Sequence, residues 1–202
     1  MGNVSPAACR KPGGNYPLSQ TNNDHSDFAD AHPGVEVIGT DISPIQPGWV
    51  PPNLQFEMED ATQAWTFAPE SFDFVHIRYM FGSVTDWDAL FAEAYRVLRP
   101  GGYVESFEAD ARMYAPDGTV VDGSPLDQWG KVFREGGKKF GRTFMVVGED
   151  LQRKGLEAAG FVDLVQHDFK VGAFPVVVHW CRGPYWASVD ESIWWACRGA
   201  LC

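Results

Sequence analysis

The sequence is short of basic residues and of long apolar runs, and each shortage excludes a class of protein. Its 202 residues carry 16 Lys and Arg against 27 Asp and Glu, a formal net charge of −11. Nucleic-acid binding needs clustered positive charge, so we expect no nucleic-acid partner. No apolar run approaches the roughly 20 residues of a membrane span or forms a signal-peptide core. We therefore expect no membrane contact and an intracellular protein, cytoplasmic or nuclear.

Cysteine is also scarce. The four cysteines (Cys9, Cys181, Cys197 and Cys202) have no CxxC spacing and lie near the ends of the chain. This spacing predicts reduced thiols rather than a disulfide framework, and no metal site. The length suits one domain that can bury a substantial core.

The chain divides into three unequal parts. Residues 1–26 are polar and broken by proline and glycine, which predicts a disordered or irregular segment. Residues 27–170 alternate strand-like runs with amphipathic helical runs, the pattern of an α/β sheet. Residues 171–202 form an apolar tail rich in tryptophan and cysteine.

Periodicity and end signals locate the elements of the middle part. Strands are expected at residues 35–40, 54–58, 72–77, 103–107 and 162–168, and helices at 87–98, 126–140 and 149–159.

Four segments of this part follow one another in a familiar order. They are Val37-Ile-Gly-Thr-Asp41-Ile-Ser-Pro, Glu59-Asp60-Ala61, Phe72-Asp73-Phe-Val-His76 and Leu98-Arg-Pro-Gly-Gly-Tyr103-Val. Their order and spacing resemble class I S-adenosylmethionine-dependent methyltransferases, in particular the fungal group typified by the secondary-metabolism regulator LaeA. The resemblance implies a Rossmann-like sheet with helices on both faces and S-adenosylmethionine as cofactor. It also implies methyl transfer to a small metabolite or a protein side chain, in secondary metabolism.

The same resemblance assigns cofactor-binding positions to Asp41, Ile42, Asp60, Ala61 and Arg78. Asp41 matches the acid that binds the ribose hydroxyls; alternatively it caps the turn after its strand. Asp60 and Ala61 match the pair that meets the adenine, although Asp60 could be an ordinary loop acid. Arg78 lies where the fourth strand opens toward the methionine end of the cofactor.

Other candidates have two open interpretations each. His76 is a weak candidate for a catalytic base, and a histidine packed in its strand with both nitrogens satisfied is the preferred alternative. Trp65 could pack against the adenine or in the core. Glu105 and Glu108 could touch the substrate or be ordinary carboxylates at the rim. Methyl transfer depends mainly on positioning, so no catalytic triad is expected.

The family's glycine-rich first turn is absent. Counting back from Asp27, its three glycines would fall at positions occupied by Leu18, Gln20 and Asn22. Gly13 and Gly14 do not replace them, since no apolar strand precedes them.

The first strand of the sheet is affected as well. Residues 15–20 contain one aliphatic residue and a proline, which is unsuitable for a buried parallel strand. Either strands 35–40 and 72–77 pair directly, or the sheet has a gap. The family's last antiparallel strand is also expected to be missing or altered, so the fold is expected to be incomplete.

Two alternatives to an active methyltransferase follow from these departures. The chain could be a non-catalytic binding or regulatory module, with the tail of residues 171–202 as a surface for a protein partner or for self-association. It could instead be a truncated or aberrantly joined gene product. A third, weaker hypothesis is a substrate pocket kept for a reaction without methyl transfer, such as cyclisation.

Overall fold

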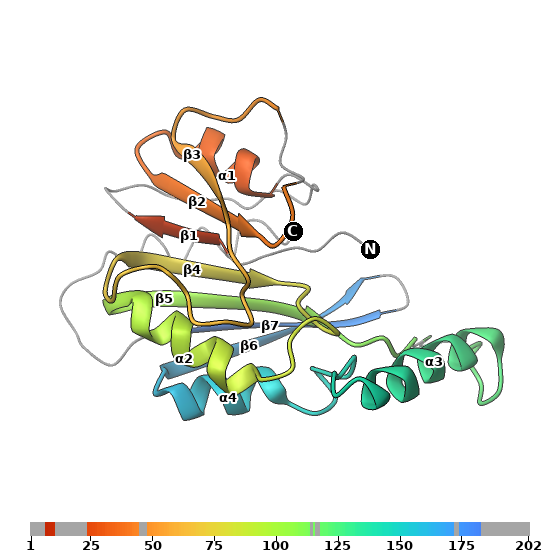
Figure 1. Cartoon of the computed structure of the whole chain (residues 1–202). Helices are drawn as coiled ribbons and strands as arrows, with labels where there is room; N and C mark the ends of the chain where they lie inside the picture. Colours follow the sequence, from red (N-terminus) through yellow and green to blue (C-terminus); the bar gives the residue numbers. More distant parts are fainter. Residues whose placement is uncertain are drawn as a thin grey trace.

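The computed structural model describes residues 7–10, 24–44, 48–113, 115, 118–171 and 174–182, which form one seven-stranded sheet with helices against it (Figure 1). The strands are β1 (Ala7–Arg10), β2 (Glu36–Asp41), β3 (Leu54–Met58), β4 (Phe72–Arg78), β5 (Leu98–Ala109), β6 (Val162–Val171) and β7 (Phe174–Arg182). The helices are α1 (Asp24–Ala31), α2 (Trp87–Val97), α3 (Pro125–Lys139) and α4 (Leu151–Ala159). The strand order is β3-β2-β1-β4-β5-β7-β6.

The five strands and three helices expected from periodicity are confirmed, with ends that differ by a few residues. Helix α2 has two features that a sequence pattern can indicate, a capping residue at its start and a buried apolar face. Asp86 caps it by accepting a hydrogen bond from the Ala89 backbone at 2.9 Å. Leu90, Phe91 and Ala94 are among the residues that bury its apolar face.

The expected arrangement around the first strand is wrong. The second and fourth family strands neither pair directly nor leave a gap, because β1 lies between them. It comes from residues 7–10, inside the segment expected to be irregular, and it runs antiparallel to both β2 and β4. Ala7 lies opposite Gly39 and His76, and Arg10 lies opposite Glu36.

The last antiparallel strand, expected to be missing or altered, is present. β7 runs antiparallel between β5 and β6, with Ser106 of β5 opposite His179. Its register with β6 runs from Val171 opposite Phe174 to Val162 opposite Arg182, with one irregularity. Residues 183–202, the remainder of the predicted apolar tail, lie outside the described residues.

Helices cover both faces of the sheet, as expected. The main core packs under α2 and α4 and includes Val75, Ile77 and Val104, with Ile38 of β2 against it. The neighbouring residue, Val37, joins a smaller core with Phe28 of α1. Because consecutive strand residues point to opposite faces, α1 lies on the face away from α2 and α4. Among the described residues, no helix is both long and apolar enough to span a membrane.

Candidate cofactor site

The parallel strands β2, β3, β4 and β5 end at one side of the sheet, which we call the carboxyl edge. Ligands of open α/β sheets bind outside such edges. Two of the predicted acids, Asp41 and Asp60, lie here on the turns after adjacent strands. The turns are joined by a hydrogen bond from the Glu59 backbone to the Asp41 carbonyl at 3.1 Å.

Asp41 is the last residue of β2 and is 7% exposed. One carboxylate oxygen accepts a hydrogen bond from the Ser43 backbone at 2.8 Å. The cap proposed as the alternative role of Asp41 is therefore real. Within the described part of the chain its second oxygen has no hydrogen-bond partner, so the cap uses only one of the two acceptor oxygens.

Asp60 has the same arrangement. One oxygen accepts hydrogen bonds from the backbone and the hydroxyl of Thr62, at 2.9 and 2.7 Å. The other has no partner among the residues the structure describes. Both acids are therefore oriented by their own turns, and each keeps one acceptor oxygen.

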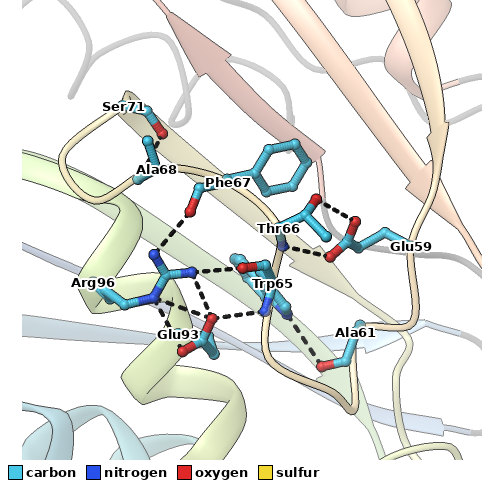
Figure 2. Close-up of polar contacts among 9 residues, drawn as sticks. All are labelled: Glu59, Ala61, Trp65, Thr66, Phe67, Ala68, Ser71, Glu93 and Arg96. Carbon is cyan, nitrogen blue, oxygen red and sulfur yellow. Dashed lines mark hydrogen bonds and ion pairs between the residues drawn. The ribbon is translucent and has the colours of Figure 1, made fainter.

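The loop that carries Asp60 and Ala61 is tied down at both of its ends (Figure 2). Glu59 accepts hydrogen bonds from the backbone and hydroxyl of Thr66, at 2.8 and 2.9 Å. On α2, Arg96 donates to the carbonyls of Trp65 and Phe67 at 2.9 and 2.8 Å.

Glu93, one turn before Arg96 on α2, completes the anchor of this loop. It accepts from the Trp65 backbone at 2.8 Å and from Arg96, whose hydrogen bonds lower the pKa of Glu93. Charged partners of this kind fix a loop that has little secondary structure of its own.

Trp65 belongs to the core rather than to an open adenine platform. Its side chain is buried in the main cluster, and its indole nitrogen donates to the Ala61 carbonyl at 3.2 Å. Ala61 itself is buried, whereas Ile42 is 52% exposed beside Asp41. Of these three side chains, that of Ile42 is the most exposed.

Arg78 ends β4, which is separated from β2 by β1. Its guanidinium carbon lies 5.0 Å from the ring centre of Tyr79 and 5.2 Å from that of Phe107. Such contacts orient a cation in place. Tyr79 has a φ of 51°, a left-handed backbone conformation that is uncommon for an aromatic residue.

The His76 side chain is buried and already has a hydrogen-bond partner. Its Nδ1 lies 2.6 Å from a carboxylate oxygen of Glu105, the residue opposite it on β5, and both side chains are buried. On the same face His25 of α1 has a pKa lowered to about 4, by burial and then by the charge of His76. This geometry favours the structural interpretation of His76, because Nδ1 already has a partner.

Glu108 is fully buried on β5 and accepts hydrogen bonds from the backbones of Met80 and Phe81, at 2.8 and 3.1 Å. Burial raises its pKa to about 8. It holds the loop that leaves β4 at the carboxyl edge. Neither Glu105 nor Glu108 is thus an ordinary rim carboxylate. β5 lies between β4 and β7 and is buried on both faces, and the two polar residues gave no sign of this in the sequence.

A family model for a methyltransferase domain matches residues 11–164 of the chain. The chain belongs to this methyltransferase family. The match covers the carboxyl edge with Asp41, Asp60 and Arg78, and the motif order gave the same assignment.

Fungal relatives agree with the methyltransferase assignment. The methyltransferase pytC of Aspergillus terreus is 38% identical over 73% of this chain and 46% of its own length. The secondary metabolism regulator LAE1 of Cochliobolus heterostrophus is 34% identical over 72% of this chain and 47% of its own length. The chain therefore spans about half the length of these relatives. Among solved structures, the cyclase SpnF matches with a TM-score of 0.51 and 16% identity, over 73% of this chain and 66% of that chain, which shows the fold alone.

The direction of β1 changes the carboxyl edge of this methyltransferase. A parallel first strand would end at the carboxyl edge, and a glycine-rich turn would follow it there. β1 instead ends at Arg10 opposite Glu36, the start of β2, so the chain leaves it at the far edge. A strand does precede Gly13 and Gly14 in the chain, contrary to our expectation, but these two glycines lie outside the described residues. Positions 18, 20 and 22 lie outside the described residues.

Proposed function

We propose that this methyltransferase binds S-adenosylmethionine at the carboxyl edge and transfers its methyl group to an acceptor. The observation that carries the proposal is the pair Asp41 and Asp60 on adjacent parallel strand ends, each with one carboxylate oxygen not used within the described chain. Two acceptors on neighbouring turns suit a nucleoside, which offers ribose hydroxyls and an exocyclic amine.

The roles of the site residues follow from their positions. Asp41 accepts from the ribose hydroxyls, and Asp60 from the adenine amine, with Ile42 and Ala61 contributing apolar contacts. Arg78, farther along the edge, attracts the carboxylate of the methionine end. When bound, the cofactor supplies a methyl group on a positively charged sulfur, an electrophile that needs no metal or covalent intermediate. The chain's contribution is to hold and orient the reactants.

The acceptor is a small metabolite or a protein side chain. The similarity to the secondary metabolism regulators LAE1 and laeA of Aspergillus flavus supports a role in secondary metabolism. His76 is the candidate base in this proposal: Glu105 holds Nδ1 and orients the ring, and proton transfer would run through Nε2.

Titration calorimetry with S-adenosylhomocysteine tests the cofactor site. We expect Asp41→Ala to weaken binding about tenfold or more, because a hydrogen bond to a charged group contributes about 1.5–3 kcal/mol. Asp122→Ala, which removes an exposed acid far along the chain from both turns, is the matched control. An unchanged dissociation constant for Asp41→Ala removes Asp41 from the site.

The antiparallel direction of β1 favours a second candidate function, a non-catalytic binding or regulatory module. Such a module needs no cofactor affinity. A folded chain that shows no heat of binding with S-adenosylhomocysteine at millimolar concentration would support it, and a protein partner should then be sought. Residues 174–182 of the predicted tail form the interior strand β7, so only residues 183–202 remain our proposal for that contact.

A further inference from the structure

A cleft of about 490 Å³ opens beside the carboxyl edge and away from Asp41 and Asp60. One side is the start of α2, and the other is the end of α3 with the segment that follows it. The two sides are joined by a hydrogen bond from the Gly82 backbone to the Thr143 carbonyl at 2.8 Å. Gly82 belongs to the loop after β4, so the cleft borders the loop that Glu108 holds.

One wall of the cleft is basic in a protein with a net charge of −11. Arg134 and Lys138 lie one turn apart on α3, and Arg142 follows the helix. The ion pair of Lys138 with Glu135 is highly exposed and therefore weak. Three cations converging on one cleft favour an anionic group in the ligand.

The inner surface is apolar and well fixed. Trp87 and Leu151 line it, together with Phe144. The Phe144 ring packs edge-on against Phe81, with centroids 6.0 Å apart, and against Phe133 at 5.3 Å. An apolar surface held by several rings suits a small molecule, since small-molecule sites are mostly apolar and largely preformed.

Acidic residues also line the cleft, at the start of α2 and in the segment that follows α3. Asp86 is already used by the backbone of Ala89 at the start of α2. Asp88 and Glu149 also line the cleft, and both are exposed. Carboxylates there accept hydrogen bonds from a hydroxyl or an amine, the groups that are methylated in O- and N-methyl transfer.

We propose that this cleft binds the methyl acceptor, and that the acceptor is a small apolar carboxylic acid with a hydroxyl or amine group. That the ligand is a methyl acceptor rests on the proposed function, but binding of the ligand in the cleft can be tested separately. Arg134, Lys138 and Arg142 hold the carboxylate, the apolar surface holds the body, and Asp88 and Glu149 orient the hydroxyl or amine.

The test is titration of the full chain with 4-hydroxycinnamate and with its neutral amide, in parallel with S-adenosylhomocysteine. The acid should bind at least about tenfold more tightly than the amide. Lys138→Ala should weaken binding of the acid about fivefold, and the double variant Arg134→Ala/Lys138→Ala more than about tenfold. Lys139→Ala is the matched control, because Lys139 is the next residue of α3 and does not line the cleft. All three variants should bind S-adenosylhomocysteine as the unchanged chain does.

The two proposals fail in different ways. Equal affinity of the acid for Lys138→Ala and Lys139→Ala, equal affinity for acid and amide, or no binding of the acid overturns the cleft proposal. In that case binding of S-adenosylhomocysteine still supports the cofactor site. Binding of the acid that depends on Lys138, in a chain that does not bind S-adenosylhomocysteine, supports the cleft as a binding site and counts against methyl transfer.

Discussion

Asp41 and Glu108 are both buried acids on strands that lead to the carboxyl edge, but they are satisfied differently. Asp41 uses one oxygen for its own turn, through the Ser43 backbone. Both oxygens of Glu108 accept backbone hydrogen bonds, one from Met80 and one from Phe81. An acid with an unused oxygen at a ligand-binding edge is a candidate site residue, whereas an acid with both oxygens used by the backbone is a structural one.

Replacing Glu108 with glutamine should change how stability depends on pH. Below pH 4.5, the ordinary value, the carboxyl is protonated in the folded and the unfolded chain. Between pH 4.5 and the raised pKa of about 8, only the unfolded chain loses this proton. The free energy of unfolding therefore falls as the pH rises, by up to about 1.4 kcal/mol per pH unit. Above pH 8 this fall ends. A glutamine does not titrate, so in Glu108→Gln the free energy of unfolding should not show this fall between pH 4.5 and about 8.

Urea unfolding at pH 5, 7 and 9 measures this effect. Glu157→Gln is the control, because Glu157 is exposed and pairs with Arg153 on the surface of α4. In Glu157→Gln the free energy of unfolding should change with pH as it does in the unchanged chain. If it changes with pH equally in Glu108→Gln and Glu157→Gln, Glu108 ionises normally in the folded chain.

β1 is the element that sequence reasoning missed. Ala7-Ala8-Cys9-Arg10 has four residues and no β-branched side chain, so neither periodicity nor propensity distinguishes it from a loop. Its place is decided by the two strands beside it, which would otherwise leave unpaired backbone groups in the middle of the sheet. β2 and β4 accept a strand of either direction, and here the antiparallel one is formed.

Ala8→Pro should therefore damage the whole sheet. Ala8 is paired with Ile38 on one side and Val75 on the other, and proline has no backbone donor for a central strand. We expect a loss of about 3 kcal/mol in the free energy of unfolding, or the loss of a cooperative melt. Ala8→Gly keeps the donor and should lose no more than about 1 kcal/mol. Equal stability of the two variants would contradict the central position of β1.

Taken whole, the molecule retains a continuous sheet although it spans about half the length of relatives such as pytC. Among the described residues a main core packs under α2 and α4, and β7 joins β5 to β6. Both proposed binding regions, the carboxyl edge and the cleft, are formed by elements of this sheet and its helices.

Cofactor binding should stabilise the molecule as a unit. With S-adenosylhomocysteine at about 100 times its dissociation constant, the free energy of unfolding should rise by about 2.7 kcal/mol. For a chain of this length the melting temperature should rise by roughly 5–10 °C. A thermal melt with and without the ligand measures this shift, with adenine alone as the control. A cooperative melt that the ligand does not move would contradict the cofactor site, since any ligand of the folded state must stabilise it.

Signals between residues close in sequence determine part of the fold and of the candidate site. Periodicity, caps and the Pro-Gly-Gly turn after α2 act between near neighbours, so five strands, three helices and the acids at the ends of β2 and β3 could be predicted. Long-range contacts decided the rest. The direction of β1, the insertion of β7, the pairing of His76 with Glu105 and the burial of Trp65 depend on partners 20 or more residues away. The cleft likewise requires α3 to meet the loop after β4, because Gly82 and Thr143 come together only when the sheet brings both loops to the same edge.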